Sequence, residues 1–238
     1  MGKDVIIALD FPSAEESFAF LGRLGAARPF VKIGMELFYS EGPNIVRRLK
    51  DRGYKVFLDL KLHDIPNQVR RSMAALSRLG ADMTNVHAAG GIDMMRAAVE
   101  GLTRPDGTRP LLIAVTQLTS TSEEMLREQL LIASPMEETV AKYGLNAKEA
   151  GLDGVVCSPL EAAAVKERCG KGFVTVTPGV RFEDSGADDQ SRVTTPAKAR
   201  ELGSDYIVMG RPITRADDPL AAYNKAVDDF SGLKVTFS

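Results

Sequence analysis

Four charged residues stand in or just after two short apolar stretches, where a buried strand would normally carry none. Lys32 lies in the first stretch, Asp59 and Lys61 lie at the end of the second, and Asp64 follows three residues later. On a strand, Asp59 and Lys61 would share a face because they are two residues apart. Burial of an unpaired charge is expensive, so these side chains need one another as partners. The sequence predicts an alternating Lys-Asp-Lys-Asp network, which can serve structure or chemistry.

The residue types in this network indicate acid chemistry more than covalent chemistry. Carboxylates around Lys61 favour its ammonium form, whereas a lysine that forms a Schiff base must be neutral. We therefore expect Lys61 to donate a proton. Two neighbouring lysines favour the ionised form of Asp59, so we expect its role to be electrostatic.

Two later segments combine glycine with arginine in a way that suits a phosphate group. They are Thr177–Arg181 and Gly210–Ile213, and each follows a short apolar stretch. Backbone N–H groups bind phosphate well, and Arg181 and Arg211 can add charge-assisted hydrogen bonds. We expect the two segments to form one phosphate site if the strands before them are neighbours.

Apolar stretches rich in Val, Ile and Leu alternate with amphipathic ones, which predicts strands buried on both faces with helices between them. The predicted strands are Val5–Leu9, Phe30–Gly34, Val56–Leu60, Met83–His87, Leu111–Val115, Gly154–Cys157, Val174–Val176 and Tyr206–Met209. The predicted helices are Ala14–Leu24, Asn44–Arg52, Val69–Leu79, Asp93–Leu102, Met136–Ala150, Leu160–Arg168, Pro196–Leu202 and Pro219–Phe230. A further short helix is expected near Ser122–Leu131, within a long loop at Thr116–Ser134.

Eight such units of about 30 residues fit a (β/α)8 TIM barrel, in one domain spanning residues 1–238. An open dinucleotide-binding sheet is disfavoured, because no glycine-rich loop follows the first strand. In a barrel, functional residues gather where strands end. The residues at those ends are Asp10, Lys32, Asp59, Lys61, Asp64, His87, Thr119, Thr177–Gly179, Gly210 and Arg211. This placement favours a functional role for the charged network, and the long polar segment Phe182–Thr194 is the expected lid.

Composition narrows the partners and the compartment. Lys plus Arg number 30 and Asp plus Glu 32, and the net charge of −2 gives no electrostatic case for nucleic acid or an anionic membrane. No apolar stretch approaches the ~18 residues of a membrane span. Cys157 and Cys169 fit no disulfide framework or zinc pattern. We expect a cytoplasmic protein that binds neither nucleic acid nor membrane and has no metal site.

Five segments together resemble the orotidine 5′-phosphate decarboxylase family. They are Ile7–Asp10 (IALD), Val31–Gly34 (VKIG), Asp59–Asn67 (DLKLHDIPN), Thr177–Arg181 (TPGVR) and Gly210–Thr214 (GRPIT). Asn85–Ala88 and Val115–Ser120 are similar to the bacterial branch, and the resemblance runs from about Val5 to Tyr223. The DxKxxD core alone is shared with a sister family of sugar-phosphate decarboxylases and synthases, whereas the longer motifs are more specific.

The resemblance implies a carboxy-lyase that converts orotidine 5′-phosphate to uridine 5′-phosphate without a cofactor, the last step of de novo pyrimidine nucleotide synthesis. It implies a homodimer in which the two subunits share each active site. Lys61 would protonate C6 after carbon dioxide leaves, and Asp59 would face the substrate carboxylate. Asp64 would reach across the dimer into the partner's site.

The resemblance also assigns the binding residues. Asp10 and Lys32 would hold the ribose, and Thr119 would contact the pyrimidine. The residues implied for the 5′-phosphate are Arg181, Gln190, Gly210 and Arg211. Ile65 and Gln68 stand at further substrate positions, and many family members carry Thr where this chain has Gln68.

Three other functions stay open from the residues alone. A sister-family enzyme would use a divalent metal and an enediolate, and activity without metal would exclude it. A class I aldolase would form a Schiff base on Lys61, which borohydride would trap. A barrel that only binds a phosphorylated ligand is disfavoured, because binding alone does not need both Asp59 and Lys61 in an apolar strand.

Overall fold

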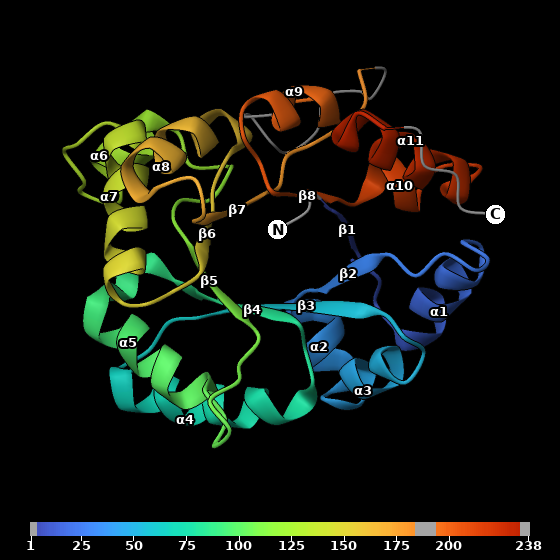
Figure 1. Ribbon diagram of the computed structural model, residues 1–238, viewed down its shortest axis with the longest axis horizontal. Helices are drawn as coiled ribbons and strands as arrows, with labels where there is room; N and C mark the ends of the chain where they lie inside the picture. Colours follow the sequence, from blue (N-terminus) through green and yellow to red (C-terminus); the bar gives the residue numbers. More distant parts are fainter. Residues whose placement is uncertain (1–3, 184–193, 234–238) are drawn as a thin grey trace.

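The computed structural model describes residues 4–183 and 194–233. Its eight strands are all parallel and close into a barrel in sequence order, β1 to β8, with β8 hydrogen-bonded to β1. Figure 1 shows the strands as an inner ring with the helices around it. The fold is therefore the (β/α)8 barrel that the sequence predicts.

The elements follow the predicted alternation. The strands are β1 (Asp4–Ala8), β2 (Phe30–Ile33), β3 (Lys55–Leu62), β4 (Met83–His87), β5 (Leu111–Val115), β6 (Gly154–Val156), β7 (Val174–Thr177) and β8 (Tyr206–Met209). The α-helices are α1 (Ala14–Gly22), α2 (Met35–Glu41), α3 (Asn44–Lys50), α4 (Pro66–Leu76), α5 (Gly91–Leu102), α6 (Glu123–Glu128), α7 (Met136–Glu149), α8 (Ala162–Cys169), α9 (Pro196–Glu201), α10 (Arg211–Thr214) and α11 (Pro219–Ser231). Short 3-10 turns lie at Ser77–Leu79, Ala88–Gly90 and Pro159–Glu161.

The structure differs from the prediction mainly around helices. Helices α2 and α10 were not predicted, and α10, with four residues, is too short to show an apolar period. Helix α4 begins at Pro66, three residues before the predicted start, since proline fits the first turn of a helix. Among the described residues, no helix has both the length and the apolar character needed to cross a bilayer.

The barrel interior is filled by inward-facing side chains at alternate strand positions. Phe30, Phe57 and Met83 belong to one buried cluster inside the ring, with further members on β1, β5, β7 and β8. Because side chains alternate between faces, Lys32 and Asp59 continue this inward row two residues further along β2 and β3. The strand period thus directs charged side chains into the mouth of the barrel.

Three aspartates clamp neighbouring strands at the end of the barrel where the strands begin. Each aspartate lies just before an even-numbered strand and exchanges two hydrogen bonds with one residue of the preceding strand. The backbone N–H of the aspartate donates to the carbonyl of that residue, and the carboxylate of the aspartate accepts the backbone N–H of that residue. The pairs are Asp82 with Val56, Asp153 with Leu112 and Asp205 with Thr175. A Lys or Arg side chain neutralises each carboxylate. These clamps fix strand register opposite the functional end.

Candidate active site

A single pocket occupies the mouth of the barrel at the carboxyl ends of the strands and encloses about 720 Å³. This volume lies within the range of small-molecule sites. Its floor is made of apolar side chains from six strands, Ala8, Phe57, Val115, Val156, Val176 and Val208. Polar groups stand around that floor in three places, so the pocket could hold a ligand that is apolar in the middle and charged at its ends.

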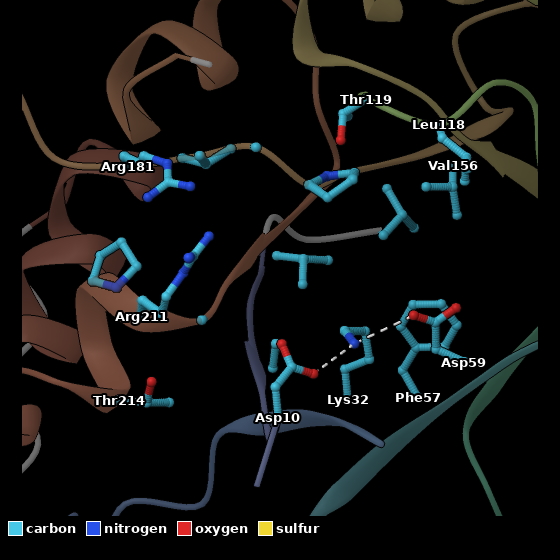
Figure 2. Close-up of a pocket in the computed structure, with 18 of the residues that line it drawn as sticks. Asp10, Lys32, Phe57, Asp59, Leu118, Thr119, Val156, Arg181, Arg211 and Thr214 are labelled. Carbon is cyan, nitrogen blue, oxygen red and sulfur yellow. Dashed lines mark hydrogen bonds and ion pairs between the residues drawn. The ribbon is translucent and has the colours of Figure 1, made fainter. Parts of the chain in front are cut away.

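The first polar group is a chain of ion pairs along β1, β2 and β3. Lys32 Nζ lies 3.3 Å from Asp10 Oδ1 and 3.3 Å from Asp59 Oδ2, and Lys61 Nζ lies 2.8 Å from Asp59 Oδ1. Figure 2 shows Asp10, Lys32 and Asp59 linked in a row across the pocket. The side chain of Asp59 is 9% exposed, whereas that of Asp10 is 64% exposed. The structure therefore joins four of the predicted charged residues in one network.

The pKa values in this network reflect the balance of burial and charge. Burial alone would raise the pKa of Asp59, but the ammonium groups of Lys32 and Lys61 and a hydrogen bond from Asn85 lower it below its ordinary value. Burial alone would lower the pKa of Lys32, yet Asp59 and Asp10 raise it overall. Both groups are thus held in their charged forms at neutral pH.

Strand β3 is irregular at the residue that carries the candidate acid. Lys61 has a φ of 51°, a left-handed conformation that costs energy for a residue with a Cβ atom. The pairing of β3 with β4 shifts register between Leu58 and Leu62. Asn85 on β4 fills this irregularity, since its side-chain oxygen accepts the Lys61 N–H at 2.8 Å and its Nδ2 donates to Asp59 Oδ1 at 2.6 Å.

The second polar group contains two arginines and comes from the loops after β7 and β8. Pro178, Gly179, Arg181, Gly210 and Arg211 all line the pocket. Figure 2 shows Arg181 and Arg211 on the opposite side of the space from Asp59. The N–H of Arg181 donates to the Thr194 carbonyl at 2.9 Å, and the Thr194 N–H donates to the Gly179 carbonyl at 3.1 Å. This pairing anchors the base of the loop at the arginine side.

The third polar group follows β5. Gln117, Leu118, Thr119 and Ser120 line the pocket there, with the Thr119 hydroxyl on the same side as Val156 in Figure 2. Of these residues, the sequence singled out Thr119 alone.

The remaining predicted site residues lie elsewhere. Asp64, Ile65 and Gln68 are exposed and do not line the pocket, and the Asp64 carboxylate accepts the Ile65 N–H at 2.6 Å. Gln190 and most of the expected lid Phe182–Thr194 fall outside the described residues. Within residues 4–183 and 194–233, no three His, Cys, Asp or Glu side chains are grouped as metal ligands would be.

Sequence reasoning missed Asn85 and the apolar floor. Both could have been found from strand period, because Asn85 follows the inward-facing Met83 by two residues and Val176 follows Val174 in the same way. Thr214 and Arg215, which also line the pocket, follow Arg211 on or just after the short helix α10. That helix brings them back to the mouth of the barrel.

The fold and the pocket together are those of a (β/α)8-barrel enzyme, with functional groups on the loops that follow the strands. The family model described as "Orotidine 5'-phosphate decarboxylase / HUMPS family" matches residues 3–226. The chain is 60% identical over 230 residues to the orotidine 5'-phosphate decarboxylase of Bacillus caldolyticus, covering 95% of this chain and 94% of that one. The chain belongs to this family.

Two further relatives agree over nearly the full length. The orotidine 5'-phosphate decarboxylase of Bacillus cereus (strain Q1) is 54% identical over 238 residues, which is 99% of this chain and all of that one. The crystal structure of orotidine 5'-phosphate decarboxylase from Lactobacillus acidophilus superposes with a TM-score of 0.86 at 44% identity, covering 96% of this chain and 99% of that chain.

Proposed function

We propose that this protein decarboxylates orotidine 5′-phosphate to uridine 5′-phosphate, a step of pyrimidine biosynthesis, without a metal or organic cofactor. The observation that carries the proposal is the ion pair of Lys61 with the buried Asp59 at the edge of an apolar floor. The relatives at 54–60% identity bear the name of this activity. The side of the pocket with Lys61 and Asp59 matches the pyrimidine carboxylate of the substrate, and the side with Arg181 and Arg211 matches its phosphate.

In the proposed reaction, the bond between C6 and the carboxylate carbon breaks and carbon dioxide leaves. The electron pair stays at C6, and a proton from Lys61 Nζ forms the new C6–H bond; water then reprotonates the lysine. The Lys61 ammonium stabilises the developing negative charge because it is already in place before the charge forms. The negative charge of Asp59 repels the substrate carboxylate, and this repulsion ends when neutral carbon dioxide forms. The lowered pKa of Asp59 keeps its carboxylate ionised for that role.

The phosphate end supplies binding energy. Arg181 and Arg211 can form charge-assisted hydrogen bonds to phosphate oxygens, and the backbone N–H groups after Gly179 and Gly210 can add neutral ones. Binding energy from a group that does not react can be used to hold the reacting carbon against Lys61. Gln190 is proposed as a further phosphate ligand by family resemblance.

Asp64 is proposed to complete the site of a partner subunit in a homodimer. Asp64 and Ile65 lie after β3 and are exposed, and the exposed apolar side chains of Met35 and Tyr39 lie after the adjacent strand β2. Exposed apolar groups after two adjacent strands, with Ile65 next in the chain to a carboxylate that no ion pair holds in the described residues, fit a contact with a second copy. A two-fold dimer would then carry two equivalent composite sites.

Mixing two inactive variants tests this shared site. A heterodimer of Lys61→Ala and Asp64→Ala subunits would have both defects in one site and none in the other, so activity should reappear on mixing. The control is each variant mixed with itself. A heterodimer verified by differential tags that stays inactive would show that Asp64 serves its own subunit.

The reaction itself is tested by the loss of the orotate ring absorbance when purified protein meets orotidine 5′-phosphate in EDTA. We expect turnover at the same rate with and without the chelator. No product in either condition would contradict the proposed reaction. Activity that EDTA abolishes and Mg²⁺ restores would contradict the cofactor-independent mechanism and favour the metal-dependent chemistry of the sister family.

A further inference from the structure

Asn85 is the one fully buried amide that lies between the two key groups of the described site. It is 0% exposed and sits on β4 beside the irregular part of β3. Its Nδ2 donates to Asp59 Oδ1 at 2.6 Å, the same oxygen that pairs with Lys61 Nζ at 2.8 Å. Its Oδ1 accepts the backbone N–H of Lys61 at 2.8 Å.

The strand irregularity explains why a side chain is needed here. Leu58 on β3 pairs with Thr84 on β4, and Leu62 pairs with Val86. Between these two pairs β3 therefore advances by four residues while β4 advances by two. The regular ladder therefore cannot supply a carbonyl for the Lys61 N–H, and a buried N–H without an acceptor is costly. Asn85 takes the place of that carbonyl while Lys61 holds its left-handed φ of 51°.

Asparagine suits this position because it carries a donor and an acceptor on one short side chain. Ionised aspartate has no donor for Asp59, and leucine, of similar shape, has neither group. The two partners also fix the orientation of the amide, since a carboxylate only accepts and an N–H only donates. The Asn85 side chain thus ties the carboxylate plane of Asp59 to the backbone of Lys61.

We propose that Asn85 is a positioning residue that sets Lys61 Nζ against the reacting carbon by holding both Asp59 and the Lys61 backbone. This inference rests on the proposed decarboxylation. Asn85 does not line the pocket, so it acts through its two partners. The charged and titratable groups around these partners are Lys32 on β2, Asp10 after β1 and His87 on β4, besides Asp59 and Lys61 themselves.

The test compares three variants with the wild type. Asn85→Ala removes both hydrogen bonds. Asn85→Asp keeps the shape and the acceptor but replaces the donor with a carboxyl group. Thr84→Val is the matched control, because Thr84 is also buried on β4 and also bonds across to β3, through Leu58 O at 3.0 Å, without touching the site.

We expect Asn85→Ala to lower kcat about 10- to 150-fold, the scale of one hydrogen bond to a charged group, and to leave KM within about threefold. Thr84→Val should stay within about threefold of wild type in kcat. In Asn85→Asp, two close carboxyl groups share a proton as pH falls, and the protonated form can again donate to Asp59. The activity of Asn85→Asp relative to wild type should therefore rise from pH 8 to pH 6, which a packing defect alone would not produce.

Three results would overturn the inference: kcat of Asn85→Ala within twofold of wild type, equal losses in Asn85→Ala and Thr84→Val, or a pH-independent ratio for Asn85→Asp. If Asn85→Ala does not fold, Asn85→Asp carries the test. Hydrogen exchange of the Lys61 amide gives a readout without turnover, since that amide should lose protection in Asn85→Ala and keep it in Thr84→Val. A wild-type protein without decarboxylase activity would refute the proposed function, while the exchange measurement would still decide whether Asn85 holds Lys61.

Discussion

Replacing Asp59 with asparagine should destabilise the fold far more than the same change at Asp10. Both carboxylates lie 3.3 Å from the same Lys32 ammonium, so they differ mainly in burial. The Asp59 side chain is 9% exposed and also pairs with Lys61 at 2.8 Å, whereas Asp10 is 64% exposed. Asp10→Asn is therefore a matched control for Asp59→Asn.

The magnitude follows from the distances and the burial. At an effective dielectric constant of about 20, ion pairs at these separations are worth about 5–6 kcal/mol each before desolvation is counted. Removing one member of a buried pair costs about 3–5 kcal/mol when the other charge loses its partner. In Asp59→Asn, Lys61 loses its ion pair with Asp59, and the buried Lys32 keeps only the exposed Asp10. An exposed pair contributes about 0–1 kcal/mol. We expect Asp59→Asn to lose about 3–5 kcal/mol of unfolding free energy at pH 7, and Asp10→Asn to lose at most about 1 kcal/mol.

Urea unfolding followed by circular dichroism measures the loss of unfolding free energy in both variants. In a thermal scan, Asp59→Asn should lower Tm by about 6–20 °C for a chain of this size. The pH dependence provides a second check. The pKa of Asp59 is lowered in the folded state, so the stability that its charge adds is present above the unfolded pKa of about 3.8 and is lost as pH falls through the folded value. The difference in unfolding free energy between wild type and Asp59→Asn should therefore become smaller only below about pH 4. Equal stability losses in the two variants, or an Asp59→Asn protein as stable as wild type, would refute the reasoning.

Three further predictions follow from the same site. Lys61→Ala should abolish turnover while binding of uridine 5′-phosphate, measured by calorimetry, survives; near-wild-type turnover would remove Lys61 as the acid. Arg211→Ala should lower kcat/KM for orotidine 5′-phosphate by about 10- to 150-fold, the scale of ~1.5–3 kcal/mol for a charged hydrogen bond; an equal loss for the phosphate-free nucleoside would contradict the phosphate role. Burial, His63 and Lys61 lower the pKa of His87, so the unfolded chain binds its proton more readily and stability should rise with pH up to about 6.5. His87→Gln should flatten that rise in thermal unfolding scans, and an unchanged slope would show that other groups cause it.

The sequence by itself determined the barrel and most of the charged network. Apolar stretches separated by amphipathic ones specify strands buried on both faces, and the number of such units specifies the closed ring. The two-residue spacing of Asp59 and Lys61 was enough to predict their pairing, because side chains alternate along a strand. Glycine and arginine after two of these stretches predicted the phosphate segments. The family motifs added the expected substrate, which strand period does not contain.

Tertiary structure alone decided how these groups are held. The closure of β8 on β1 places Gly210 beside Asp10, and a Cβ atom at Gly210 would lie 3.7 Å from Asp10 Oδ2. No local sequence pattern predicts a contact between residues so far apart in the chain. The extra residues in β3 and the left-handed backbone of Lys61 lie beside Asn85, which belongs to the next strand and accepts the Lys61 N–H. Register and strain are properties of paired strands, and hydrogen bonds between strands fix them. The sequence therefore specified which side chains reach the mouth of the barrel, and strand pairing determined the positions of their charged atoms.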